Sequence, residues 1–154
     1  MAELNKVVAR FADGTLLKGT TADFHVAKSS FHINPVNGGA SVDVSVRSLK
    51  ALFFVKDFKG GPHSPALKGF SDAPGTPGGK KIAVRFKDGE LLCGFTLSYV
   101  PGREGFFMFP ADGDSNNIRI FVANATVAEV RVGTDADELV RRVKSERSRA
   151  AMKI

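Results

Sequence analysis

Two stretches of this chain, residues 6–35 and 81–110, align without a gap at an offset of 75 positions. Eleven of the 30 aligned positions are identical, including the dipeptides Asp13-Gly14 and Asp88-Gly89. A repeat of this length is a recurring folding unit, and its copies bury apolar surface within themselves or against each other. The repeat therefore predicts two small domains, where the length of 154 residues alone would suggest one.

Each copy carries the pattern of a β-hairpin. Three alternating apolar residues precede Asp13-Gly14 and Asp88-Gly89, and Asp-Gly in this position is typical of a type I′ turn, whose central residues need positive φ. Return strands are expected at 15–24 and 90–99, each with one glycine where a strongly bent strand tolerates no side chain. Later alternating residues predict three more strands in each copy. Five short antiparallel strands would close best as a small barrel, which leaves no exposed sheet edge.

The segments outside the two copies differ from them in composition. Ten of the 25 residues from 56 to 80 are Gly or Pro, which is typical of a turn-rich linker. Thr134 is a suitable helix N-cap, acidic residues follow it, and basic residues come later, as the helix dipole favours. The expected organisation is a first β-barrel repeat at 1–55, a linker at 56–80, a second β-barrel repeat at 81–133 and a basic C-terminal helix at 134–154.

The hairpin sequences also resemble a known motif. Phe-Ala-Asp-Gly-Thr-Leu-Leu-Lys-Gly at 11–19 and Phe-Lys-Asp-Gly-Glu-Leu-Leu-Cys-Gly at 86–94 are similar to the first motif of Sm-like barrels. The Arg-Gly of the second Sm motif, which shapes the RNA pocket in that family, is present in neither copy. The resemblance implies a mainly β fold with two tandem five-stranded SH3-like or Sm-like barrels related by internal duplication, plus the C-terminal α-helix.

Two further resemblances concern function. The whole chain resembles an uncharacterised family of bacterial tandem domains, in which the Asp-Gly repeat precedes a segment like Ser-Leu-Lys-Ala-Leu-Phe-Phe-Val-Lys-Asp-Phe at 48–58. This resemblance implies a regulatory or adaptor module of unknown ligand. PilZ domains, which bind cyclic di-GMP, are more distantly similar. The spacing from Arg142 to Arg147 does not match their Arg-x-x-x-Arg signature, and Asp112-Gly-Asp-Ser-Asn-Asn lacks the final glycine of their second motif.

The net charge of +6 is concentrated in one place. Residues 81–133 carry six Lys or Arg against six Asp or Glu, whereas all six basic residues of 134–154 lie at or after Arg141. A barrel that follows a phosphate backbone needs basic residues on the barrel itself. We interpret the tail as a solvated helix, with contact to RNA or a membrane surface as the alternative. The candidate anion or nucleic-acid contacts are Arg141, Arg142, Lys144, Arg147 and Arg149.

No catalytic or metal-binding pattern is found. His25 and His32 align with Val100 and Phe107, so they do not belong to a shared site, and Cys93 is the single cysteine. A single cysteine forms no intrachain disulfide, which fits a reducing cytosol. No apolar run approaches the ~20 residues of a membrane span, and the start lacks a signal-peptide core. We expect a cytoplasmic, bacterial-type protein that is not an enzyme and has no metal, cofactor or membrane span.

The strongest functional signal is the asymmetry between the copies. Six positions that are polar or small in the first copy are apolar in the second: Lys18/Cys93, Thr20/Phe95, Ala22/Leu97, His32/Phe107, Asn34/Phe109 and Asp43/Phe121. The second copy therefore has an additional apolar face that must be covered. We expect the first copy, Phe53 or the helix bearing Leu139 and Val143 to cover it, and a homodimer or partner interface is the alternative. The candidate interface residues are Phe95, Leu97, Phe107, Phe109, Phe121 and Phe53.

These observations favour a non-enzymatic regulatory or protein-interaction module, for which a protein partner or a homo-oligomer is expected. Two alternatives stay open. One is a nucleic-acid-binding Sm-like protein that uses the basic tail. The other is a sensor of a small ligand, of the cyclic-dinucleotide type, with its pocket between the two barrels.

Overall fold

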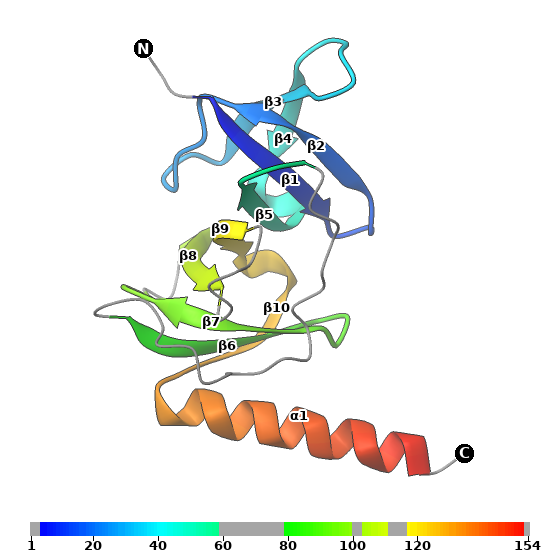
Figure 1. The fold of residues 1–154 in the computed structure, drawn as a ribbon, viewed down its shortest axis with the longest axis vertical. Helices are drawn as coiled ribbons and strands as arrows, with labels where there is room; N and C mark the ends of the chain where they lie inside the picture. Colours follow the sequence, from blue (N-terminus) through cyan, green and yellow to red (C-terminus); the bar gives the residue numbers. More distant parts are fainter. Residues whose placement is uncertain (1–3, 59–78, 100–102, 111–116, 153–154) are drawn as a thin grey trace.

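The computed structural model describes residues 4–58, 79–99, 103–110 and 117–152. Within these residues the chain forms ten strands, two 3-10 turns and one helix (Figure 1). The elements are β1 (Asn5–Phe11), β2 (Leu16–Thr21), β3 (Ser30–Pro35), β4 (Val42–Ser45), η1 (Val46–Ser48), β5 (Leu49–Val55), β6 (Lys80–Phe86), β7 (Leu91–Thr96), β8 (Gly105–Pro110), β9 (Asn117–Ala123), η2 (Asn124–Thr126), β10 (Val127–Val132) and α1 (Thr134–Met152). The mainly β fold and the helix after the last strand are confirmed. Most of the expected linker lies outside the described residues.

The strands pair antiparallel in one open order, β10-β6-β7-β8-β9-β5-β1-β2-β3-β4. The expected pair of closed five-stranded barrels is therefore not confirmed. The physical reason is the pairing of β5 with β9, which places Ala51 opposite Val122 and Leu52 opposite Phe121. This ladder continues the sheet from the first half of the chain, which contains β1 to β5, into the second half, which contains β6 to β10. All seven residues of β5 are buried, and all except Lys50 are apolar, which is typical of a strand that is covered on both faces.

The two Asp-Gly hairpins form a different turn from the expected one. Only the glycines have positive φ, +92° at Gly14 and +93° at Gly89, and no described non-glycine residue does. The Gly14 N–H donates to the Phe11 carbonyl, and the Phe11 N–H donates to the Thr15 carbonyl. This pattern is a three-residue hairpin loop in which a type I turn is followed by a left-handed glycine. The Asp13 carboxylate accepts a hydrogen bond from the Thr15 N–H at 2.9 Å. This bond stabilises the turn while the backbone of Asp13 keeps a negative φ.

Three clusters of buried side chains form the core. One lies mainly in the first half and includes Phe121 of β9, and a second lies mainly in the second half and includes Ala51, Phe53 and Val55 of β5. In the third, α1 packs Leu139 and Val143 against Leu91 and Cys93 of β7. Figure 1 shows the helix along the side of β6 that faces away from the first half. The described part of the chain contains no helix that combines the length and the apolarity needed to cross a lipid bilayer.

An ionic cluster also connects the two halves. The Lys50 side chain is only 8% exposed, and its Nζ lies 2.6 Å from an Asp88 oxygen and 2.8 Å from a Glu90 oxygen. The same Glu90 oxygen lies 3.1 Å from Arg10, and Lys50 Nζ lies 4.8 Å from the Phe86 ring centroid. Burial raises the pKa of Asp88, but the hydrogen bonds from Lys50 and from the Glu90 N–H outweigh it and lower the pKa below its usual value.

Replacing Lys50 by alanine is expected to lower the free energy of unfolding by about 2 kcal/mol, as is typical when a hydrogen bond to a charged group is lost. The carboxylates of Asp88 and Glu90 would then lie close together without their shared cation. Urea denaturation of both proteins measures the difference. Lys87→Ala, on an exposed position of the same hairpin, is the control and should change the stability by less than about 0.5 kcal/mol.

The effect of Lys50→Ala should also depend on pH. The folded-state pKa of Asp88 lies below its ordinary value. Its ion pair therefore stabilises the fold above that ordinary value, and the contribution is lost as the pH falls through the lower folded-state pKa. The difference between variant and wild type should accordingly shrink in acid. An equal denaturation midpoint for both proteins at neutral pH would contradict the prediction.

Candidate ligand-binding site

The structure divides the six candidate interface residues between the interior and the surface. Phe121 is 1% exposed, and Phe53 and Phe95 are each 8% exposed. Phe107 and Phe109 are half-buried, whereas Leu97 is 59% exposed. The additional apolar face of the second half is therefore covered over most of its area and open at one end.

The cover over this face comes from the first half. The Phe24 ring, from the loop after β2, lies 4.9 Å from the Phe121 ring centroid and 6.0 Å from that of Phe107. The Phe54 ring of β5 lies 5.8 Å from that of Phe107. Most of these ring pairs meet edge to face, which is a favoured arrangement for aromatic side chains. Packing within the chain thus accounts for the covered surfaces of Phe107 and Phe121.

The helix α1 covers the other part of the face, around Cys93. The thiol is buried against the helix, and burial raises the pKa of Cys93 to about 12. A thiol with this pKa is neutral at physiological pH, and the thiolate is the reactive form of cysteine. Cys93 therefore acts as a small apolar side chain of the core.

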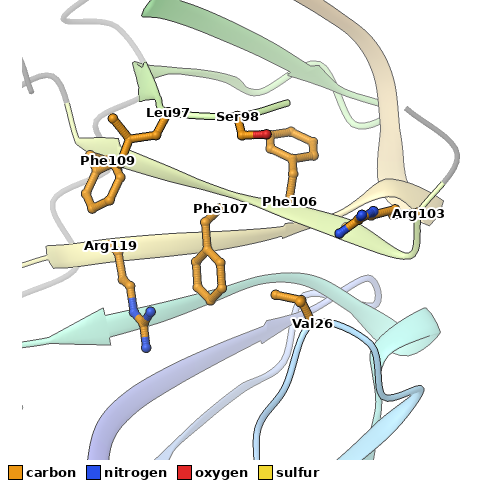
Figure 2. A pocket seen from close by; sticks show the side chains of 9 residues that line it. Val26, Leu97, Ser98, Arg103, Phe106, Phe107, Phe109 and Arg119 are labelled. Carbon is orange, nitrogen blue, oxygen red and sulfur yellow. The ribbon is translucent and has the colours of Figure 1, made fainter. Parts of the chain in front are cut away.

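The uncovered end of the face borders a hollow with a volume of about 300 Å³, which we call the seam hollow. Its apolar wall contains Leu97, Phe107 and Phe109 from the second half, and Val26 from the loop of the first half that also carries Phe24. Two cations, Arg103 and Arg119, belong to the same lining. Figure 2 shows Phe107 between the two arginines, with Val26 on the side of the first half. The hollow thus combines an apolar surface with positive charge.

Arg119 is held in an unusual environment. Its guanidinium carbon lies 4.4 Å from the Phe54 ring centroid and 4.5 Å from the Phe107 ring centroid. Burial lowers the pKa of Arg119 from its ordinary value. No carboxylate within the described parts of the chain forms an ion pair with it. Arg119 is therefore a partly desolvated cation whose described contacts are aromatic rings.

Sequence analysis did not identify Arg119 as a candidate. The signal was present, because Phe121 had been assigned to the additional apolar face and successive residues of a strand alternate between its faces. A residue two positions before Phe121 on β9 therefore lies on the same face. Extending the alternation by one step would have identified Arg119 from the sequence.

The basic residues of the helix are partly used by the fold. Arg142 donates two hydrogen bonds of 3.0 Å to the Glu129 carboxylate, and Arg147 donates to the Gly89 carbonyl at 3.0 Å. These contacts raise the pKa of Arg142 and lower that of Glu129. Four of the five candidate contacts lie exposed on α1, namely Arg141, Arg142, Lys144 and Arg149, and Arg142 is exposed although it pairs with Glu129.

The histidines do not gather into a site. The His32 Nδ1 lies 2.8 Å from an Asp23 oxygen, and this hydrogen bond is the main cause that raises the pKa of His32. His25 accepts a local backbone hydrogen bond from Ala27, and His63 lies outside the described residues. Within the described ranges, no group of three or more His, Cys, Asp or Glu side chains is arranged to hold a metal ion.

Comparison with known proteins gives one finding. A family of unknown function (DUF6982) matches residues 3–134, which is most of the chain. No curated protein and no solved structure matches this chain. The match begins before β1 and ends at the first residue of α1, so it spans all ten strands and the seam hollow. The chain therefore belongs to the DUF6982 family.

Proposed function

We propose that this protein is a non-enzymatic protein-interaction module and that the seam hollow is its binding surface. The observation that carries the proposal is the 59% exposure of Leu97 beside the half-buried Phe109, at the one open end of an otherwise covered apolar face. Single exposed apolar side chains such as Leu16 are ordinary, but apolar side chains that adjoin one another beside polar residues are typical of an interaction surface, and Leu97 adjoins such a group around the hollow. Phe109 belongs to the paired strand β8, and Leu97 directly follows β7, so the strand pairing places both residues beside the hollow.

The shape of the hollow favours a peptide segment over an enclosed small molecule. Its volume of about 300 Å³ lies at the lower end of the range for small-molecule pockets, which bury most of their ligand. Leu97, which is 59% exposed, would be covered only in part by a ligand held inside the hollow. A peptide that crosses the hollow could cover both the interior and this rim.

We also propose that the chain arose by duplication of a five-stranded unit of SH3-like or Sm-like type. The two halves have matching strand registers in support of this history. Val7 pairs with Gly19 across β1–β2 as Ile82 pairs with Gly94 across β6–β7. A register shift interrupts the β1–β5 and β10–β6 ladders at corresponding positions. A 3-10 turn precedes both β5 and β10.

The proposed function is tested with a displayed library of random 12-residue peptides, selected on the purified full chain. We expect the selection to yield peptides whose affinity falls at least about tenfold when Leu97 is replaced by aspartate, because a charge would then enter the apolar rim. Leu16→Asp is the matched control. Leu16 is 51% exposed at the start of β2, away from the hollow, and its replacement should leave the affinity unchanged.

Two outcomes would contradict the proposal. One is a library from which no peptide depends on Leu97. The other is turnover of a defined substrate by the purified chain, which would make the protein an enzyme. The nucleic-acid alternative is measured on the same preparation, with an RNA oligonucleotide at low and high salt. Tight binding that weakens steeply with salt and depends on Arg141 and Lys144 would favour that alternative instead.

A further inference from the structure

We propose that the seam hollow recognises an acidic side chain or a C-terminal carboxylate of the bound peptide, with Arg119 as the residue that receives it. The inference rests on the proposed function, because it names the chemistry of the partner at the same site. Its starting point is the pairing of a partly desolvated cation with an apolar wall in one hollow. A ligand that matches both has a negative group next to an apolar one.

The two rings beside Arg119 limit how a ligand can approach it. The ring centroids of Phe54 and Phe107 lie 4.4 and 4.5 Å from the guanidinium carbon. These centroids are only 5.8 Å apart and the rings are tilted by 54° to each other, so the rings do not enclose the guanidinium group from opposite faces. The guanidinium forms no hydrogen bond within the described structure, which leaves its N–H groups for an anion. Two parallel N–H groups of arginine fit the two oxygens of a carboxylate, so a carboxylate is the anion that suits this site.

The energetic argument points in the same direction. A buried or partly buried cation without a counterion carries a desolvation cost, and an anion that pairs with it recovers part of that cost. The other ion pairs of the described structure join side chains of the chain itself, as in Arg85 with Glu146 and Arg142 with Glu129. Arg119 differs because it lines a hollow and forms no such pair among the described residues. A carboxylate from outside would complete it.

A peptide acid fits this site better than a nucleic acid does. A single-stranded nucleic acid needs a basic groove along several phosphates and open aromatic faces for its bases. The faces of Phe107 and Phe54 are occupied by Arg119 and by neighbouring rings. The remaining cation, Arg103, is exposed and adds attraction for an acidic segment. Leu97 and Phe109 would receive an apolar side chain next to the acidic one.

The experiment combines variants of the protein with variants of the peptides that depend on Leu97. Affinities are measured by titration calorimetry for wild type, Arg119→Met and Arg119→Lys. Arg119→Met should weaken binding by about 10- to 100-fold, as expected for a lost charged hydrogen bond. Arg119→Lys should lie in between, because it keeps the charge but loses the planar fork. Arg141→Met, an exposed arginine of α1, is the matched control and should bind as wild type.

The decisive measurement is a double-mutant cycle. Changing the peptide acid to its amide should weaken binding to wild type by the same factor as Arg119→Met, and should have no further effect on that variant. Melting temperatures show that each variant is folded. Additive losses, or Leu97-dependent peptides without any acid, would overturn the inference and leave the proposed function standing. RNA binding that is lost in Arg119→Met would also overturn it. Failure to obtain any Leu97-dependent peptide contradicts the proposed function itself.

Discussion

Replacing Gly94 by alanine is expected to lower the melting temperature by about 10 °C or more, or to prevent folding. A Cβ at this position of β7 would collide with the backbone carbonyl oxygen of Phe109 and would lie 2.8 Å from the Met108 methyl carbon. The carbonyl belongs to the paired strand β8, where Phe109 stands opposite Phe95. The backbone cannot give way without separating the two strands. The cost therefore lies at or above the upper end of the range of about 1–3 kcal/mol for overpacked cores.

The equivalent position of the first half should behave in the same way. A Cβ on Gly19 would collide with the Asn34 carbonyl oxygen of β3 and would lie 2.7 Å from a methyl carbon of Ile33. Neither glycine has positive φ, so the effect comes from space and not from the backbone conformation. Similar losses for Gly19→Ala and Gly94→Ala would support the proposed duplication.

Gly89→Ala separates the effect of a steric collision from the effect of backbone conformation. Gly89 has a φ of +93°, and a Cβ there would meet nothing within 4 Å. Alanine at this turn should cost only about 1 kcal/mol of backbone strain, or a shift of about 2–4 °C. The measurement is thermal unfolding followed by circular dichroism. A smaller loss for Gly94→Ala than for Gly89→Ala would contradict the strand geometry described for β7 and β8.

The local elements of this fold were accessible from the sequence because their causes are local. Alternating apolar residues identified β1 and β6, and the Asp-Gly pairs identified the turns after them. The turn type was wrong, because Asp-Gly is compatible with both a two-residue and a three-residue loop. The return strand was also expected to reach residue 24. In the structure β2 ends at Thr21, and Phe24 follows in a loop that places its ring between the two halves.

The long-range arrangement was not accessible in the same way. The apolar run of β5 predicts a strand that is buried on both faces, but it does not name the neighbours of that strand. The pairing with β9 joins residues that lie more than 60 positions apart, such as Leu52 and Phe121. The excess of apolar residues in the second half did indicate that a surface had to be covered. Strand alternation from Phe121 also places Arg119 on this face, but the role of Arg119 depends on the rings that the junction brings to it.

Replacing Phe121 by alanine is expected to lower the free energy of unfolding by about 3–5 kcal/mol, as for other large aromatic side chains removed from a core. Phe121 is 1% exposed. Its ring centroid lies 4.9 Å from that of Phe24 and 5.5 Å from that of Phe107. Its removal would leave a cavity at the junction of the two halves, lined by rings from both. The effect should exceed that of any substitution at the rim of the seam hollow.

Phe109→Ala is the matched control, because Phe109 lies half-buried at the open end of the same apolar face. Its loss should cost about 1 kcal/mol, the typical effect of a point substitution. Urea denaturation gives the stabilities, and sedimentation gives the oligomeric state of each protein. If Phe121 belongs to the interior of one chain, its variant loses stability without a change of oligomeric state. A stable Phe121→Ala monomer from a dimeric wild type would instead make this face an interface between copies, because the rings would then be covered by a second chain and not by Phe24.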